Sequence, residues 1–188
     1  MEQHYLNSSF REKLIEHSLI SELLKMSWKN GSCSIEISKP EVDNQGYDLI
    51  MEDLGAFRHV QLKTSHIGSS TARQKIHVAL ANKPSGCVVW VYFNEITMEL
   101  GPFLYFGGEP NKKLPDISEF PIAKHTKGNA EGIKNERPSI RVVSKSKFAV
   151  LNTIEELYET LFKIVFCYAL RFVFKVVCGS FGIALLTP

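Results

Sequence analysis

Three polar residues with complementary chemistry lie close together in the segment 41–65, namely Asp48, Gln61 and Lys63. Carboxylate and amide oxygens are ligands that Mg²⁺ accepts in proteins, while water or substrate phosphate fills its remaining positions. A protonated lysine cannot bind the metal, but it can orient a nucleophilic water or offset negative charge that develops on a phosphate. The three residue types are therefore suited to metal-assisted hydrolysis of a phosphate ester. The alternative is a solvated Asp–Lys pair on an exposed hairpin, which contributes only about 0–1 kcal/mol.

The predicted backbone brings these side chains to one face of a β-hairpin. Two segments with strand composition, 47–52 and 57–64, are joined by a short turn. If the turn has a two-residue loop, Asp48 lies opposite Gln61; if the loop is two residues longer, Asp48 lies opposite Lys63. Opposite residues of an antiparallel pair share a face, as do residues i and i+2 of one strand. Either register therefore places the three side chains together.

A helix is predicted ahead of the hairpin, from Phe10 to Ser27, after a capping-box pattern formed by Ser9 and Glu12. Its apolar residues recur at helical spacing and form one buried face, which contains Glu16. A buried carboxylate is costly unless it is paired or bound to a metal. Glu16 is thus the candidate acid on this helix, and Glu22, near the edge of the apolar arc, is the fallback. Glu16 could instead be a rim residue whose carboxylate reaches water.

The order of predicted elements continues beyond the hairpin. A strand at 33–38 precedes it, a helix at 71–81 follows it, and the continuous apolar run Gly86–Phe93 is typical of a strand buried on both faces. The core order is therefore helix, three strands, helix, strand. Further elements are expected near the C-terminus: strands at 103–106, 140–143 and 148–151, and a helix that follows a second capping box at Thr153 and reaches Phe162.

This order, with Glu in the first helix, Asp in the second strand and Gln-Leu-Lys in the third, resembles the restriction-endonuclease-like PD-(D/E)xK nuclease superfamily. The resemblance covers about residues 9–93, and the chain to about Phe162 reads like a small bacterial family of this kind. It implies an α/β fold with an αβββαβ core, in which helices flank a mixed central sheet. It also implies Mg²⁺- or Mn²⁺-dependent cleavage of phosphodiester bonds in nucleic acid, with DNA expected rather than RNA.

The same resemblance assigns roles to individual residues. It implies that Asp48, Gln61 and Glu16 hold the metal and that Lys63 acts at the phosphate. Gln61 departs from the commonest form of the motif, which has an acid at this position. Variants with QxK occur among superfamily members related to methyl-DNA restriction enzymes.

Composition sets the size of the fold and locates its positive charge. The chain has 188 residues, 44% of them hydrophobic, which is enough for one compact domain with a core. The net charge of +2 gives no general basic field, but the segment 124–141 concentrates Lys and Arg among Gly, Asn and Ser. Such a loop can contact phosphates, or it can be an ordinary solvated loop. The candidate nucleic-acid contacts are Lys124, His125, Lys127, Arg137 and Arg141.

The cysteines and the N-terminus indicate a cytoplasmic protein. The four cysteines lack metal-ligand spacing and three lie in apolar runs, which is typical of buried free thiols in a reducing compartment. The N-terminus has no basic region followed by an apolar stretch, so no secretory signal is expected.

The segment 163–188 is strongly apolar and its status stays open, so the predicted domain covers residues 1–162. Its uncharged part, 176–188, is shorter than the roughly 20 residues that a membrane span requires. Charges at Arg171 and Lys175 also oppose insertion, and no membrane association is expected. The segment could instead continue the preceding helix and pack on the domain or on a second copy, as in a homodimer. It could also be an altered terminus.

Two classes of function compete on these observations. The first is a metal-dependent nuclease, and the second is a non-catalytic module that binds nucleic acid or a protein on the same fold. The amide at Gln61 favours the second, because one fewer anionic ligand weakens metal affinity. Glu16 and Lys63 favour the first, because binding alone requires neither residue at the site.

Overall fold

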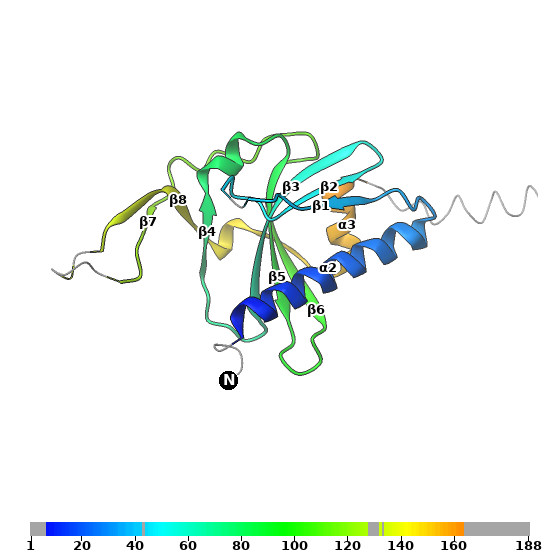
Figure 1. The fold of residues 1–188 in the computed structure, drawn as a ribbon, viewed down its shortest axis with the longest axis horizontal. Helices are drawn as coiled ribbons and strands as arrows, with labels where there is room; N and C mark the ends of the chain where they lie inside the picture. Colours follow the sequence, from blue (N-terminus) through cyan, green and yellow to red (C-terminus); the bar gives the residue numbers. More distant parts are fainter. Residues whose placement is uncertain (1–6, 43, 128–131, 133, 164–188) are drawn as a thin grey trace, which may run out of the picture.

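Figure 1 shows the fold in a computed structural model, which describes residues 7–42, 44–127, 132 and 134–163. A mixed six-stranded sheet in the order β1-β2-β3-β5-β6-β9 forms the centre, and β4, β8 and β7 form a second, antiparallel sheet. The chain is thus α/β with a mixed central sheet, as predicted. The elements are α2 (Ser8–Asn30), β1 (Glu36–Ser38), β2 (Leu49–Asp53), β3 (Ala56–His66), β4 (Arg73–His77), the 3₁₀ helix η1 (Val78–Asn82), β5 (Gly86–Phe93), β6 (Leu100–Gly107), β7 (Ile122–Lys124), β8 (Glu136–Ser144), the 3₁₀ helix η2 (Lys145–Lys147), β9 (Ala149–Leu151) and α3 (Ile154–Phe162).

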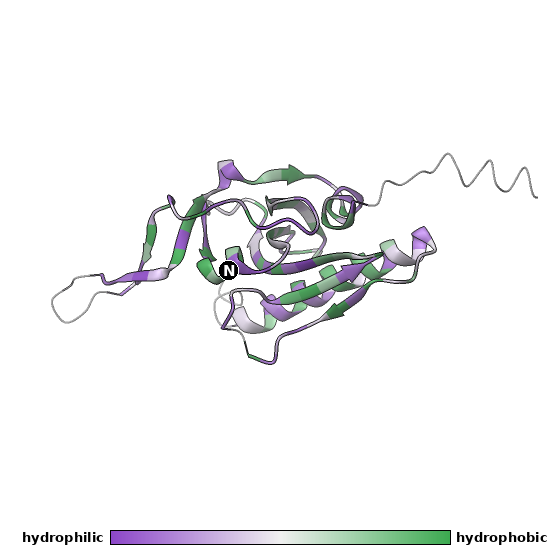
Figure 2. Cartoon of the chain, turned by 90° about the horizontal axis from the view of Figure 1, so that it is seen from above, coloured by the Kyte–Doolittle hydropathy of each residue, from purple (hydrophilic) through white to green (hydrophobic). Residues whose placement is uncertain are grey.

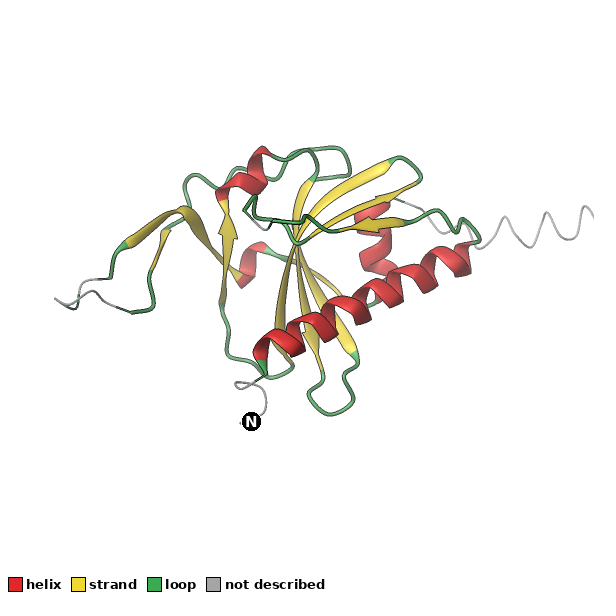
Figure 3. Cartoon of the chain, in the orientation of Figure 1, coloured by secondary structure: helices red, strands yellow, loops and turns green. Residues whose placement is uncertain are grey.

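The central sheet lies between two different layers. One face packs against the helices, through residues such as Leu19 of α2 and Leu161 of α3. The other face packs against the second sheet and η1, through Ile76, Leu80 and Val143. The second sheet stands at the left of the central sheet in Figure 3. The α-helices therefore cover one face, and a sheet occupies the place where a flanking helix was predicted.

β5 is the strand buried on both faces that the sequence predicts, with the same bounds. Its odd-numbered residues 87–93 pack with the helices, and its even-numbered residues 88–92 pack with the second sheet. A strand covered on both sides reads as a continuous apolar run because neither set of alternate side chains meets water. Figure 2 shows the chain coloured by hydropathy, with hydrophobic and hydrophilic residues alternating along the strands and helices.

The first helix extends beyond its predicted bounds. α2 has Asn7 as its N-cap and no side-chain capping bond, so the capping box predicted at Ser9 is wrong. The helix is followed by Gly31, whose φ of 71° supplies a left-handed C-cap. The predicted apolar face is confirmed, because its central residues are buried: Ile15, Leu19, Leu23 and Met26.

The β2–β3 hairpin has the shorter of the two loops considered. Its register pairs Asp53 with Ala56, so that Leu54 and Gly55 alone form the loop. Both loop residues have positive φ, 48° and 81°, as a type I′ turn requires. This turn matches the twist of the flanking strands and thereby fixes which residues face each other across the hairpin.

A buried carboxylate ties the turn end of this hairpin to both helices. Asp53 has no exposed surface and accepts hydrogen bonds from the hydroxyl groups of Ser34 and Tyr158. Burial, together with this bond to Asp53, raises the pKa of Tyr158 to about 12. The N–H of Ser34 in turn donates to Oγ of Ser27 at 3.2 Å. Because residues 33–35 are engaged in this way, β1 begins at Glu36, later than predicted.

The helix predicted at 71–81 is wrong: this segment forms β4 followed by η1. β4 pairs with β8, a strand about seventy residues later, from Arg73 opposite Ser144 to His77 opposite Ile140. The apolar residues of the segment are compatible with a helix or with a strand. Pairing with β8, which is distant in the sequence, makes the segment a strand. The crossover between the parallel strands β3 and β5 therefore runs through a strand and a short 3₁₀ helix.

The predicted C-terminal helix forms with Thr153 as its N-cap, and the carboxylate of Glu156 accepts a hydrogen bond from the N–H of Asn152 at 2.7 Å. Oγ1 of Thr153 accepts a hydrogen bond from the N–H of Glu156 at 3.2 Å. At the other end, the buried guanidinium of Arg58 donates from Nε to the carbonyl of Leu161 at 2.7 Å. This bond joins the last turn of α3 to β3, so the core continues to the end of the helix.

Several predictions fall partly or wholly on residues that the structure does not describe. The segment 164–188 lies outside the described residues, so the alternatives for the apolar tail stay open. In the part of the chain that is described, no helix combines the length and apolar character needed to cross a bilayer. Cys87 is buried, and burial raises its pKa to about 11, whereas Cys33 is exposed. Cys167 and Cys178 also lie outside the described residues.

Candidate active site

The structure brings Asp48, Lys63 and Glu16 to the wall of one cavity. The cavity, of about 370 Å³, lies where the first half of α2 passes the start of β2 and the middle of β3. Glu12, one turn before Glu16, lines it as well. Glu22 lines a different cavity, beside Met98. The acid of α2 that shares a cavity with Asp48 is therefore Glu16.

Asp48 is held against β3 by two hydrogen bonds. Its N–H donates to the carbonyl of Val60 at 2.8 Å, and its Oδ2 accepts from the N–H of Leu62 at 2.6 Å. Regular pairing of the two strands ends at Leu49 opposite Val60, so the predicted pair of Asp48 with Gln61 lies one residue beyond the observed pairing. The carboxylate is thus anchored to the backbone beside Lys63, and its orientation is set by the strand that carries that lysine.

Gln61 is turned toward a second cavity. Its amide is buried, and Oε1 accepts a hydrogen bond from the N–H of His77 at 3.4 Å. The second cavity, of about 450 Å³, is lined by Gln61 and Lys63 but not by Asp48. Lys63 borders both cavities because it lies between them on β3. The predicted cluster is thus divided: Asp48 and Lys63 share one cavity, and Gln61 and Lys63 share the other.

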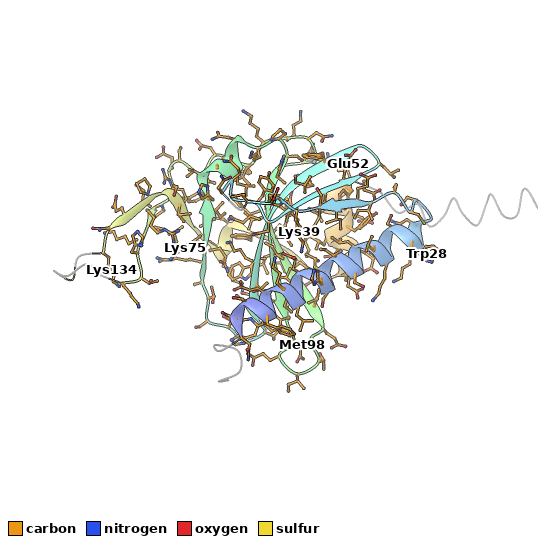
Figure 4. All side chains as sticks on the ribbon, in the orientation of Figure 1. Trp28, Lys39, Glu52, Lys75, Met98 and Lys134 are labelled. Atoms are coloured by element: carbon orange, nitrogen blue, oxygen red, sulfur yellow. The ribbon has the colours of Figure 1, made fainter. Side chains whose placement is uncertain are left out.

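Glu16 is buried and paired with two lysines. It is 5% exposed, its Oε2 lies 3.2 Å from Nζ of Lys13, and its Oε1 accepts a short hydrogen bond from Lys39. Burial alone would raise the pKa of Glu16, but the hydrogen bonds and charges of Lys39 and Lys13 outweigh it and lower the pKa below 4.5. Glu16 is therefore ionised at neutral pH, and its charge is compensated by lysines. Figure 4 labels Lys39 beside α2.

The second cavity concentrates positive charge. Lys63, Lys75 and Arg137 line it, and none of its described lining residues is acidic. Lys75 lies on β4, labelled in Figure 4 between the central sheet and the β7–β8 hairpin. Gly46 allows the close approach of β4, because a Cβ at this position would lie 2.5 Å from Cβ of His77. Lys63, Lys75 and Arg137 thus form a cationic wall in the cavity next to the one that contains the carboxylates.

The predicted nucleic-acid contacts lie on and beside the β7–β8 hairpin, which projects away from the central sheet in Figure 1. Among them, Arg137 alone lines the cationic cavity. Lys124, His125 and Lys127 are exposed farther along the hairpin. Arg141 is engaged in the fold, since its Nη1 donates to the carbonyl of Pro138 at 2.6 Å. Of the five predicted contacts, Arg137 is thus the one that the structure places at the same cavity as Lys63.

Sequence reasoning missed several residues of these cavities. Glu12 was read as a capping residue, although its spacing from Glu16 places both on one side of the helix. Lys75 and His77 lie in the segment predicted as a helix, which forms β4 in the structure and thereby comes to the cavity that Lys63 also lines. Lys39 is 23 residues from Glu16 in the chain, and no local pattern connects the two. Only the Glu12 spacing offered a signal in the sequence.

The residues of the first cavity include carboxylates suited to Mg²⁺, but these carboxylates are not positioned together around one metal-binding point. Carboxylate oxygens of Asp48, Glu16 and Glu12 are the hard ligands that this ion prefers. Among the described residues, however, no group of three or more His, Cys, Asp or Glu side chains is placed to hold a metal. The contact between Lys39 and Glu16 occupies one of the carboxylates. A metal ion would have to displace Lys39 from Glu16 before Glu16 and Asp48 could bind it together.

No protein-family model matches the sequence, and no curated protein matches it either. Any proposal about function therefore rests on the residues and on their arrangement in space.

Proposed function

We propose that this protein is a metal-dependent nuclease on a restriction-endonuclease-like fold, which hydrolyses phosphodiester bonds, with DNA as the expected substrate. The observation that carries the proposal is the position of Lys63 at the junction of two cavities. One holds the carboxylates Asp48 and Glu16, and the other is lined by Lys75 and Arg137. A phosphodiester bound at Lys63 would have anionic metal ligands on one side. It would have cations for the neighbouring phosphates on the other.

The fold is compatible with this proposal in its central part. The β2–β3 hairpin, the parallel pairing of β3 with β5 and the packing of α2 on the sheet give Asp48, Lys63 and Glu16 the relative order that the resemblance implies. The departure is the crossover, which contains β4 and η1 in place of a helix. This departure also creates the cationic wall, because it brings Lys75 next to Lys63.

Each side chain has a distinct task in the proposed reaction. Asp48, held by the N–H of Leu62, would present its carboxylate to Mg²⁺, and Glu16 would add a second anionic ligand when Lys39 moves away. The bound ion would supply an activated water and neutralise phosphate charge. Lys63 would place its ammonium at the phosphate, where negative charge develops in the transition state. Gln61, bonded to the N–H of His77, would hold β4 in position.

The second candidate is a nucleic-acid-binding module without hydrolytic activity. Two observations favour it: Glu16 is already neutralised by Lys39 and Lys13, and Gln61 faces away from the cavity that Asp48 lines. Binding would then use the cations alone, with Lys75 and Arg137 contacting phosphates. Such contacts give affinity that falls steeply as salt rises.

One assay separates the two candidates. The purified full chain is incubated with supercoiled plasmid, linear DNA and RNA, each with Mg²⁺, Mn²⁺ or EDTA. A nuclease will cleave only with metal, and Lys63→Ala will abolish cleavage while DNA binding persists. Lys29→Ala, at the far end of α2, is the matched control and should cleave like the parent protein.

Absence of cleavage would contradict the nuclease proposal. If the parent protein cuts none of the substrates with either metal, the nuclease proposal is wrong. In that case the binding module predicts salt-dependent association with DNA, and Lys75→Ala and Arg137→Ala should each weaken it. Each lost phosphate contact should lower the slope of log K against log salt by about 0.9. Cleavage that survives Lys63→Ala unchanged would also contradict the proposed role of Lys63.

A further inference from the structure

α2 carries a second apolar stripe on the side that faces away from the core. Phe10 is 73% exposed, Leu14 38%, Leu24 48% and Trp28 77%. In Figure 3 the helix runs in front of the central sheet, and no other described element is drawn across it. Scattered exposed apolar residues are ordinary, but four large ones along a single helix mark an interaction surface.

The stripe has the spacing of a helix–helix contact. Phe10, Leu14, Leu24 and Trp28, together with His17 and Ser21, alternate steps of four and three residues. At about 100° per residue these positions stay within about 40° of one line along the helix. This is the a/d seam of an antiparallel or parallel helix pair. The buried core residues of α2 occupy the opposite side, so the helix has two separate apolar faces.

The order of residues along the seam is symmetric. Positions 10 and 28, 14 and 24, and 17 and 21 lie at equal distances from residue 19. A second copy of α2 running in the opposite direction would therefore place Phe10 against Trp28. It would also place Leu14 against Leu24, and His17 against Ser21. Aromatic would meet aromatic, leucine would meet leucine, and polar would meet polar, as a two-fold interface between identical surfaces requires.

Charges beside the seam do not oppose this arrangement. Lys25 is paired within its own helix with Glu22 at 2.7 Å, and Lys13 is paired with Glu16 at 3.2 Å. Each of these two lysines therefore has an acidic partner on its own helix, although Glu16 is shared with Lys39, which also contacts His17 of the seam at 3.5 Å. Antiparallel helices also bring opposite ends of their dipoles together, whereas a parallel pair brings like ends together.

We propose that this protein forms a two-fold homodimer through antiparallel packing of α2 on α2 of a second copy, with Phe10, Leu14, Leu24 and Trp28 as the contact. The seam from Phe10 to Trp28 is about 27 Å long, at 1.5 Å per residue. The large aromatic residues lie at its two ends, and aromatic residues commonly dominate interface energies. This dimer does not depend on whether the chain is a nuclease.

The test uses the full chain and a pair of designed variants, followed by sedimentation velocity over a range of concentrations. The parent protein should sediment as a concentration-dependent dimer. Leu14→Glu with Leu24→Glu places like charges opposite each other in the antiparallel pair. The dimer dissociation constant should then rise at least about 30-fold, as expected for the loss of interface hot spots. Leu14→Glu with Leu24→Lys places each Glu opposite a Lys and should restore the dimer.

The controls separate loss of contact from loss of fold. All variants should retain the circular dichroism of the parent protein, because the substituted residues do not contribute to the described core. Val150→Glu, at an exposed apolar residue of β9, should leave the dimer unchanged. A parent protein that is monomeric at all concentrations overturns the proposal, including the case in which its own residues 164–188 cover the stripe. Equal weakening by both double variants overturns the antiparallel arrangement.

Discussion

The contact between Lys39 and Glu16 offers the sharpest test of how the candidate site is held together. Lys39→Met removes the ammonium and keeps a side chain of similar length. Glu16, 5% exposed, would then keep only its pairing with Lys13, whose own side chain is mostly exposed. We expect the ionised carboxylate to lose one charge-assisted hydrogen bond that it cannot replace fully with water.

The magnitude follows from this burial. A hydrogen bond to a charged group contributes about 1.5–3 kcal/mol, so the free energy of unfolding at pH 7 should fall by about that amount. Lys25→Met is the matched control on α2, because Lys25 pairs with Glu22 at 2.7 Å in an exposed position. Its loss should cost no more than about 0.5 kcal/mol. Urea unfolding followed by circular dichroism measures both values.

The pH dependence gives an independent check. The pKa of Glu16 is lowered in the folded protein, so its contribution to stability is present above the unfolded value of 4.5 and is lost as pH falls through the folded value. The difference in free energy of unfolding between the parent protein and Lys39→Met should therefore have its full size at pH 7 and become smaller below about pH 4.5. A difference that is absent at pH 7, or that is the same at pH 3.5, would refute the reasoning.

The same variant tests Glu16 as a metal ligand. If the carboxylate can bind Mg²⁺ once Lys39 is gone, added Mg²⁺ should stabilise Lys39→Met more than it stabilises the parent protein. At 100 times the dissociation constant the gain is about 2.7 kcal/mol. Equal responses of the two proteins to Mg²⁺ would remove Glu16 from the proposed metal site.

Two further predictions concern the strand that carries Lys63. Burial lowers the pKa of His59 below 6.5, with the carbonyl of Pro84 acting in the opposite direction and the charge of Lys83 in the same one. The contribution of neutral His59 to the free energy of unfolding is therefore full above pH 6.5 and declines as pH falls below that value. His59→Gln should remove this decline, which is measured by urea unfolding at pH 7.5 and 5.5. An unchanged decline would exclude His59 as its source. Arg58→Met leaves the carbonyls of Leu161, Thr160 and Gly108 without the guanidinium that binds them. The free energy of unfolding should therefore fall by about 2–4 kcal/mol. A fall of less than about 1 kcal/mol would contradict this account.

Local patterns predicted much of the fold where neighbouring residues decide the structure. The bounds of β5 followed from a run of apolar residues, and the position of the turn around Leu54-Gly55 followed from turn chemistry, while its loop length was one of two that the sequence allowed. The apolar face of α2 followed from helical spacing. In each case the information lies within about ten residues of chain, so the sequence displays it directly.

Predictions were wrong where a distant segment decides the structure. The segment 71–81 has a composition compatible with a helix, and it becomes β4 and η1 because β8 offers a row of backbone partners. Ser9 satisfies the rule for a helix N-cap, yet the helix begins at Ser8 and Asn7 takes that position. A residue pattern cannot reveal a partner seventy residues away, nor can it fix a helix boundary to within one residue.

In the candidate site, too, local sequence predicted some features and contacts between distant segments decided others. The sequence by itself placed Asp48, Gln61 and Lys63 on neighbouring positions of one predicted hairpin with two possible registers, and the structure has the two-residue loop of the shorter one. It also singled out Glu16 as a carboxylate on a buried face. Only the tertiary structure decided that Glu16 is compensated by Lys39, since loop and helix meet only in the folded chain.

The tertiary structure also decided which way Gln61 points and what lies beyond Lys63. β4 supplies the N–H of His77, which binds the Gln61 amide at a cavity that Asp48 does not line. The same strand places Lys75 next to Lys63 and so forms the cationic wall. Side-chain direction and electrostatic surroundings depend on contacts between segments far apart in the chain. The sequence supplied the reactive groups, and the packing of β4 and the β1–β2 connection decided their partners.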